Sequence, residues 1–186
     1  MLYKQILNEI EEEMKKAVDA TKREFSELRS GRANPKIVEG IKVNYYGTPT
    51  LLKDIATITV PEARMIVINP WDPSSLKEIE KAILQSDLGV TPINDGKIIR
   101  LIIPPLSEER RNELAKVVKK VAEEGKISIR TVRQNGKDRI KNLEKEKKIS
   151  EDDRFKAEEE LQKITDKYIS QIDKILQEKE RELKEF

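Results

Sequence analysis

Two stretches with the apolar period of an α-helix flank a block that lacks it, and this order constrains the fold more than any other feature of the chain. From residue 2 to about residue 29, residues of low polarity recur every three or four positions, and the positions between them are mostly charged. Such a helix would be roughly 40 Å long. Its stripe must be buried against another part of the protein. The stripe consists of Leu2, Ile6, Ile10, Met14, Ala17, Val18, Thr21, Phe25 and Leu28.

Residues 35–105 have a different composition, with short apolar runs bounded by proline and glycine. Runs rich in Val, Ile, Thr and Tyr predict strands at Ile41–Tyr46, Ile55–Val60, Met65–Asn69 and Ile98–Ile103. Turns are predicted at Gly47-Thr48-Pro49 and Asn94-Asp95-Gly96. A helix that starts at Pro73 is expected to bury Leu76, Ile79, Ile83 and Leu84. The block is therefore expected to be a small α/β unit.

The helical period returns after Leu106. Ser107 is the expected cap, and the acidic residues behind it suit a helix N-terminus. Gly125 and Gly136 each cost about 1 kcal/mol of helix propensity, so the pattern allows one long helix or two helices with a break. Its apolar side comprises Leu114, Val118, Val121, Ile129, Val132, Ile140 and Leu143.

A last helix is predicted after Ser150, because Ser150-Glu151-Asp152-Asp153 resembles a capping box. Its stripe is close to a heptad repeat. The stripe consists of Phe155, Leu161, Ile164, Tyr168, Ile172, Ile175 and Leu183.

The first helix is too long to be covered by the α/β block, whereas the two C-terminal segments have matching stripes. We therefore expect an α+β protein in which residues 1–30 and 106–186 form an elongated three-helix bundle and residues 31–105 form an inserted domain. The chain then crosses between the domains twice, at Ser30-Gly31 and at Pro104-Pro105. Two adjacent linkers permit bending while they limit twist, so these residues are expected to act as a hinge.

The composition excludes several functional classes. The chain contains no cysteine and no histidine, which removes disulfides, thiolate and imidazole metal ligands, and the side chain most used as a general base near neutral pH. No apolar run approaches the roughly 18 residues of a membrane span, and the N-terminus does not resemble a secretory signal. We therefore expect a cytoplasmic protein that holds no metal or cofactor. Most enzyme templates are excluded, although catalysis by carboxylates or lysine remains possible.

A basic run is the strongest candidate for a binding site. Between Gly125 and Lys137 the chain has no acidic residue. Its spacings of four, three and four residues place the cations on one helix face, where a phosphate backbone is the obvious partner. The alternative is a solvated face whose cations pair with acids of the last helix across the bundle. The four cations are Lys126, Arg130, Arg133 and Lys137.

Charge is unevenly distributed between the two C-terminal helices. Residues 107–148 hold fourteen Lys and Arg against eight Asp and Glu, whereas residues 149–186 hold eight against twelve. This imbalance makes the middle helix basic. Two further arginines, Arg29 and Arg32, flank the end of the first helix, where cations also suit the helix dipole.

Five motifs along the chain resemble bacterial ribosome recycling factor in order, spacing and overall length. Each motif alone is weak, but the five together span essentially the whole chain and are specific. They are Arg29-Ser30-Gly31-Arg32-Ala33, Tyr45-Tyr46-Gly47-Thr48-Pro49, Ser86-Asp87-Leu88-Gly89, Pro104-Pro105-Leu106-Ser107-Glu108-Glu109-Arg110-Arg111 and Ile149-Ser150-Glu151-Asp152-Asp153.

The resemblance implies an L-shaped molecule near the outline of a transfer RNA, with a three-helix bundle and a β/α/β domain joined by two hinge segments. It implies a non-catalytic monomer that binds the post-termination ribosome and, with elongation factor G and GTP hydrolysis by that factor, helps to split it into subunits. The family's rRNA-contacting arginines fall on Arg29, Arg32, Arg130 and Arg133. Position 134, often another arginine in relatives, is Gln134 here. Lys126 and Lys137 are then supporting charge.

One alternative function is a helical adaptor whose heptad-like last helix recruits another coiled coil. Two aromatic features have structural interpretations. Trp71, just before a helix start, is expected to anchor packing of the small domain, and Tyr45-Tyr46-Gly47 is expected to be a strand end followed by a tight turn.

Overall fold

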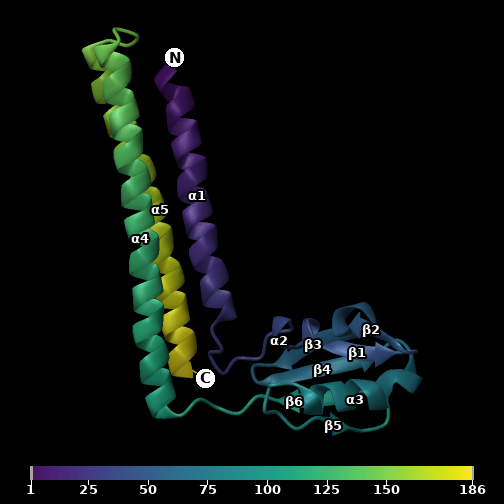
Figure 1. The fold of residues 1–186 in the computed structure, drawn as a ribbon. Coiled ribbons are helices and arrows are strands. Elements are labelled where there is room, and N and C mark those ends of the chain that lie inside the picture. Colours follow the sequence, from purple (N-terminus) through teal and green to yellow (C-terminus); the bar gives the residue numbers. More distant parts are fainter. Residues whose placement is uncertain (1, 186) are drawn as a thin grey trace. The chain divides into compact units, whose positions relative to one another are not determined.

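The computed structural model describes residues 2–185, which form two compact units (Figure 1). One unit contains the described residues up to Arg29 together with Glu108–Glu185, and the other is Ser30–Ser107. Each unit has its own core, so the two are described in turn.

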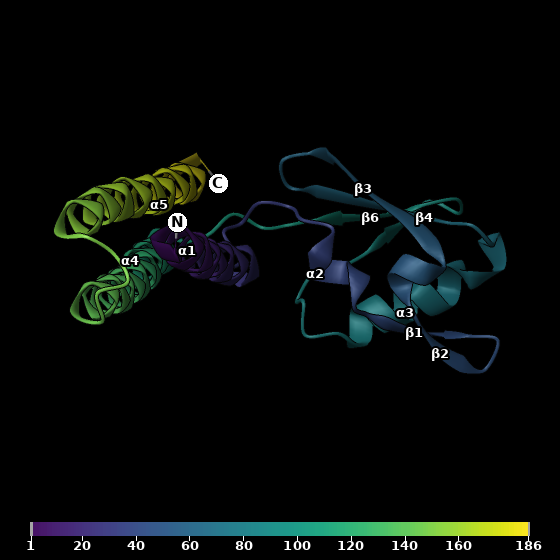
Figure 2. The same ribbon diagram turned by 90° about the horizontal axis from the view of Figure 1, so that it is seen from above.

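The first unit is a bundle of three long helices within the described residues: α1 (Leu2–Glu27), α4 (Glu108–Lys145) and α5 (Glu151–Glu185). Figures 1 and 2 show them running side by side. Helix α4 runs antiparallel to both others, because Gly125 lies against Thr21 and Ile172 whereas Gly136 lies against Ile10 and Leu161. Helix α5 begins as the sequence predicted: Ser150 Oγ accepts a hydrogen bond from the Asp153 backbone N–H at 3.1 Å.

Helix α4 is one unbroken helix of 38 residues, which decides between the two alternatives left by its glycines. Both glycines are buried against α1 and α5. A Cβ on Gly136 would lie 3.0 Å from Ile10 Cγ1, and one on Gly125 would lie 2.9 Å from Ile172 Cδ1. The glycines therefore permit close approach of neighbouring helices, and the packing gained there offsets their low helix propensity.

Most of the predicted stripes are buried, but two terminal positions are wrong. In α1 the inward residues begin at Tyr3 and Leu7, so Leu2, one position earlier, is 53% exposed. In α5, Phe155 is 56% exposed and lies in the first turn, where its ring packs under the Arg154 guanidinium at 4.1 Å. The remaining buried stripe of α5 faces the bundle and is unavailable to a further coiled coil. This stripe includes Leu161, Tyr168, Ile172 and Leu183.

The second unit is a small α/β domain. Its elements are α2 (Lys36–Glu39), β1 (Lys42–Tyr45), β2 (Thr48–Leu51), β3 (Ala56–Glu62), β4 (Met65–Pro70), α3 (Leu76–Gln85), β5 (Ile93–Asn94) and β6 (Ile99–Ile102), with 3-10 turns at Leu52–Asp54 and Pro73–Ser75. Within Ser30–Ser107, β1 and β2 form an antiparallel ribbon, and the other strands form an antiparallel sheet in the order β3-β4-β6-β5.

The four predicted strands are present, and the prediction missed β2 and β5. Pro49 was expected in a turn, but it lies in β2 opposite Asn44 of β1, on a two-stranded ribbon where its missing N–H is tolerated. The turn itself is shorter than expected. Tyr46 and Gly47 have φ values of 49° and 84°, the positive values that a two-residue hairpin turn requires.

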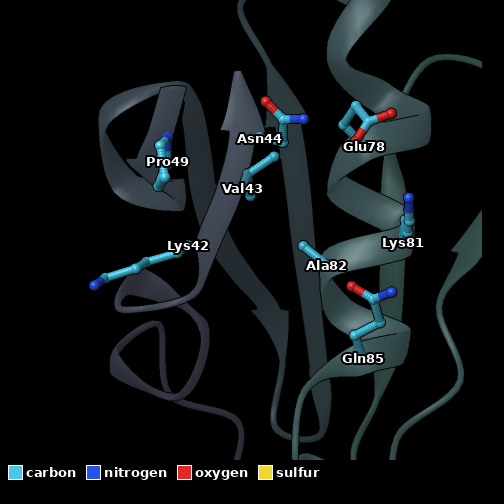
Figure 3. A pocket seen from close by; sticks show the side chains of 8 residues that line it. All are labelled: Lys42, Val43, Asn44, Pro49, Glu78, Lys81, Ala82 and Gln85. Carbon is cyan, nitrogen blue, oxygen red and sulfur yellow. The ribbon is translucent and has the colours of Figure 1, made fainter. Parts of the chain in front are cut away.

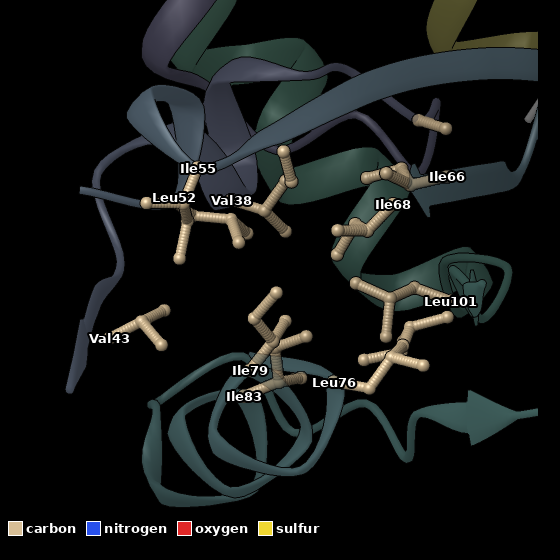
Figure 4. Packing of buried hydrophobic residues seen from close by; sticks show 13 residues of the cluster. Val38, Val43, Leu52, Ile55, Ile66, Ile68, Leu76, Ile79, Ile83 and Leu101 are labelled. Atoms are coloured by element: carbon tan, nitrogen blue, oxygen red, sulfur yellow. The ribbon is translucent and has the colours of Figure 1, made fainter. Parts of the chain in front are cut away.

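The core of this domain lies between α3 and the strands (Figure 4). Figure 4 shows Leu76, Ile79 and Ile83 of α3 facing strand residues that include Ile66, Ile68 and Leu101. Two predictions fail here. Leu84 is 59% exposed, because one residue beyond Ile83 the helix turns by about 100° away from the sheet. Trp71 is 66% exposed and is not a packing anchor; its indole N–H donates to Thr57 Oγ1 at 2.9 Å.

Polar contacts also connect the bundle helices. Glu11 of α1 accepts hydrogen bonds from Lys167 Nζ at 2.8 Å and from the Tyr168 hydroxyl at 3.1 Å. The pKa of the Glu11 carboxyl is lowered, and the hydrogen bond from Lys167 is the largest cause. Burial acts in the opposite direction and raises this pKa, whereas the hydrogen bond from Tyr168 lowers it further. At the other flank, Arg139 of α4 pairs with Glu9.

We expect Gly125→Ala to lower the free energy of unfolding by about 1–3 kcal/mol, because overpacking outweighs the gain in helix propensity. Urea denaturation followed by helical circular dichroism measures this effect. Gly40→Ala, whose added methyl would meet nothing within 4 Å, is the matched control. The atom nearest to a Cβ at position 125 would be the Thr21 hydroxyl oxygen, so Thr21→Ala in the same chain is expected to recover part of the loss. Additive effects of the two substitutions would contradict the close-approach explanation.

We expect Glu11→Gln to lower the melting temperature at pH 7 and to lose this effect in acid. A carboxyl whose pKa is lowered by folding stabilises the fold above its unfolded pKa, near 4.5, and this stabilisation disappears as the pH falls through the folded value. The gap between the melting temperatures of parent and variant should therefore begin to shrink near pH 4.5 and close as the pH falls further. Glu24→Gln, at an exposed position of α1, is the control. A melting-temperature gap that stays constant down to pH 3 would contradict the role of Glu11.

Candidate nucleic-acid interface

The four cations of the basic run lie on the flank of α4 that faces α5. The core side of α4 is occupied by Gly125, Ile129, Gly136 and Ile140, which are buried. Contacts from the flank reach Asp173 and Gln162 of α5. Helix α1 contacts α4 elsewhere, through the Arg139–Glu9 pair. The stripe therefore follows the line where α4 and α5 meet, and its four members have different surroundings.

Lys126 is a pairing cation between helices. Its side chain is only 18% exposed, and its Nζ lies 2.5 Å from Asp173 Oδ1. One heptad earlier, Lys119 pairs with Glu180 at 3.7 Å. The expectation of an unpaired stripe is therefore wrong at Lys126, because the register between the antiparallel helices places an acid of α5 opposite it. At this position the cation pairs with an acid of the last helix, which is the alternative that the sequence also allowed.

Arg130 is more accessible. Its guanidinium lies 2.9 Å from Glu123 of the same helix, and both side chains are about half exposed. Ion pairs of this kind contribute little to stability and exchange readily with other charged groups. Ile127, one turn before Arg130, is 52% exposed. Arg130 thus projects from a surface that also carries an apolar side chain.

Arg133 contacts a neutral partner. Its Nε donates to Gln162 Oε1 at 2.9 Å, and Gln162 Nε2 in turn donates to Asp166 Oδ1 at 2.7 Å. Within residues 2–185 the guanidinium makes no other hydrogen bond or ion pair. On α4, Gln134 Nε2 donates in the same way to Asp138 Oδ1 at 3.0 Å. Two acids near the stripe are therefore held by glutamine amides rather than by the arginines.

The other expected contacts are dispersed. Lys137 is half-buried, and no ion pair in the described part of the chain involves it. Arg29 is exposed beyond the end of α1, toward the N-terminal end of α4, because α1 and α4 are antiparallel and Thr21 already lies against Gly125. Arg32 is exposed and belongs to the small domain. Within the bundle, the structure therefore groups Arg130 and Arg133 but does not bring Arg29 into the same cluster.

Sequence reasoning missed Gln162 and Asp166, which set the environment of Arg133. The only trace of them in the sequence is a Gln and an Asp four residues apart on the last helix, a spacing that allows a side-chain hydrogen bond. Nothing in that pattern indicates that the glutamine also reaches α4, because that contact depends on the register of the two helices.

Features expected of other kinds of site are few. Among residues 2–185 there is no cluster of three or more acidic side chains placed to hold a metal ion. None of the described helices is both long and apolar enough to cross a membrane.

A hollow of about 250 Å³ lies between the β1–β2 ribbon and α3 (Figure 3). Its lining is mixed in charge and polarity: Lys42, Val43, Asn44, Pro49, Glu78, Lys81, Ala82 and Gln85.

An exposed Arg130 and a half-buried Arg133, with a weak and a neutral partner on one helix flank, suit the phosphates of a nucleic acid. A guanidinium can grip a phosphate with two parallel N–H donors, and loosely paired cations exchange their partners at little cost. The cluster of Arg130 and Arg133 is therefore the best candidate interface in the bundle.

Comparison with known proteins identifies the family of this chain. The family model described as "Ribosome recycling factor" matches residues 21–183. The ribosome-recycling factor of Caldicellulosiruptor bescii is 57% identical over 175 residues, which cover 94% of this chain and 95% of the relative. That of Brevibacillus brevis is 53% identical over 180 residues, covering 97% of each chain.

Solved structures agree with these relatives. A solution structure of the ribosome recycling factor has a TM-score of 0.75 at 44% identity and covers 100% of this chain and 99% of its own. A model of the T. thermophilus ribosome recycling factor, described with E. coli elongation factor G bound to the E. coli post-termination complex, has a TM-score of 0.66 at 43% identity and covers 98% and 99%. In sequence and in fold, this chain belongs to the ribosome recycling factor family.

Proposed function

We propose that this chain binds the post-termination ribosome and, together with elongation factor G, promotes its separation into subunits. The family membership and the relative described in such a complex support this role. The chain's contribution is binding and the transmission of force, and GTP is hydrolysed by the elongation factor. This chain carries no glycine-rich phosphate loop in its sequence, since Gly96-Lys97-Ile98-Ile99 lacks the other positions of that motif.

The observation that carries the proposal is the arginine cluster on the α4 flank. Arg133 keeps its two terminal nitrogens without a protein partner in the described residues, and Arg130 has only an exposed ion pair. Large-subunit rRNA is the partner that fits them, because its phosphates provide a dense array of acceptors. Arg29, Arg32 and Lys137 are further contacts in this proposal, whereas Lys126 acts through the pairing of α4 with α5.

The two chain crossings are proposed to form a hinge. They lie where the two compact units meet along the chain, around Ser30-Gly31 and Pro104-Pro105. Gly31 has a φ of 82°, a left-handed conformation that favours glycine. Movement there would allow the small domain to be displaced by the elongation factor while the bundle stays bound to rRNA.

Arg133→Ala is expected to weaken binding to vacant ribosomes by about 1–3 kcal/mol and to reduce the dependence of log K on log salt by about 1. Co-sedimentation across a salt series measures both quantities. Arg23→Ala removes the same charge from an exposed position of α1 and is the matched control. Identical affinities of the Arg133 and Arg23 variants at every salt concentration would sink the assignment.

The hinge is tested by distance measurements between spin labels. Because the chain has no native cysteine, labels attach only to cysteines that are introduced. Lys77→Cys on α3 and Lys163→Cys on α5 provide one exposed labelling position in each unit. A hinge predicts a broad distance distribution in the free protein. A single narrow distribution in free solution would show that the two units are rigidly joined.

A further inference from the structure

The contacts between α4 and α5 form a ladder with a seven-residue step. Lys119 pairs with Glu180, and Lys126 pairs with Asp173. Each step moves seven residues forward on α4 and seven residues back on α5, as antiparallel helices with a heptad seam require. The next step of the ladder joins Arg133 with Asp166.

The ladder is interrupted at this step. Arg133 Nε donates to the side-chain oxygen of Gln162, and the Gln162 amide nitrogen donates to Asp166, so the carboxylate is reached only through the glutamine. Lys119 and Lys126 contact carboxylates directly, whereas Arg133 contacts a neutral amide. The interruption falls at the cation that has the most suitable head group for a phosphate.

We propose that Gln162 is a positioning residue for rRNA binding, which orients the Arg133 guanidinium and prevents Asp166 from capturing it. This inference rests on the proposed function of the α4 flank. Gln162 fixes the guanidinium through Nε and leaves the two terminal nitrogens, which form the fork that binds a phosphate. Its amide nitrogen meanwhile occupies Asp166 Oδ1.

A carboxylate at position 162 would act in the opposite way. It would bind the guanidinium as an ion pair, would take up the fork in a bidentate geometry, and would cancel the positive charge that attracts the phosphate. Removal of the glutamine side chain would also neutralise Arg133, because Asp166 would lose its hydrogen bond to Gln162 and could pair with the guanidinium. The neutral amide is therefore the side chain that combines orientation with retained charge.

Two substitutions test the role of Gln162 in ribosome co-sedimentation. Gln162→Glu is expected to weaken binding on the order of tenfold and to reduce the salt dependence, as Arg133→Ala does. Gln162→Glu also loses the hydrogen bond to Asp166 and places a like charge four residues from it, which offsets the new ion pair with Arg133, so binding is compared at a temperature well below the melting temperature of each variant. Gln177→Glu adds the same charge to an exposed position elsewhere on α5 and is expected to bind like the parent.

The second test is a rescue. Gln162→Ala is expected to weaken binding, and Asp166→Ala in the same chain is expected to restore most of it, because the competing carboxylate is gone. A merely structural role of Gln162 predicts no restoration. If Arg133→Ala weakens binding but Gln162→Glu binds like the parent, or if Asp166→Ala rescues nothing, the inference about Gln162 is wrong. If Arg133→Ala itself has no effect, the proposed interface fails instead.

Discussion

The apolar face of α1 determines the arrangement of the rest of the chain. Its buried residues, which include Ile10, Met14 and Val18, are covered by α4 and α5, and these helices follow the small domain in sequence. Helix α4 packs closely against α1 and α5 because it has Gly125 and Gly136 at the contacts with these helices. Once these helices are packed, the register of α4 against α5 is set, and with it the surroundings of every cation on the flank of α4.

That register explains why similar cations have different roles. Lys126 faces a carboxylate, whereas Arg130 is exposed with only an exposed ion pair and Arg133 faces a neutral glutamine. A basic stripe on a helical wheel therefore gives only an upper limit to a binding surface. In the proposed interface, the part available to phosphate is what the neighbouring helix leaves unneutralised, and Gln162 is the neutral partner on that helix.

The fold was predictable where a local period or a local motif determined it. The helical stripes, the Ser150 cap and four strands belong to this class, because each depends on residues close in sequence. The exposure of Trp71 and Leu84 and the strand containing Pro49 were not predictable, since tertiary packing overrides local preference. In the same way, the positions of Arg130 and Arg133 on one face followed from spacing, but the contacts of Lys126 and Gln162 depend on the packing of two helices.

The insertion of the small domain between α1 and α4 also orders events during synthesis. Helix α1 leaves the ribosome before α4 and α5, with an apolar face that has no partner until these helices have been made. The small domain, whose residues are contiguous in the chain, can form its own core in the meantime. The bundle then closes through contacts between residues far apart in sequence, such as Ile10 and Gly136, and contacts of this kind slow folding. Helix α1 is thus made well before the two helices that cover it.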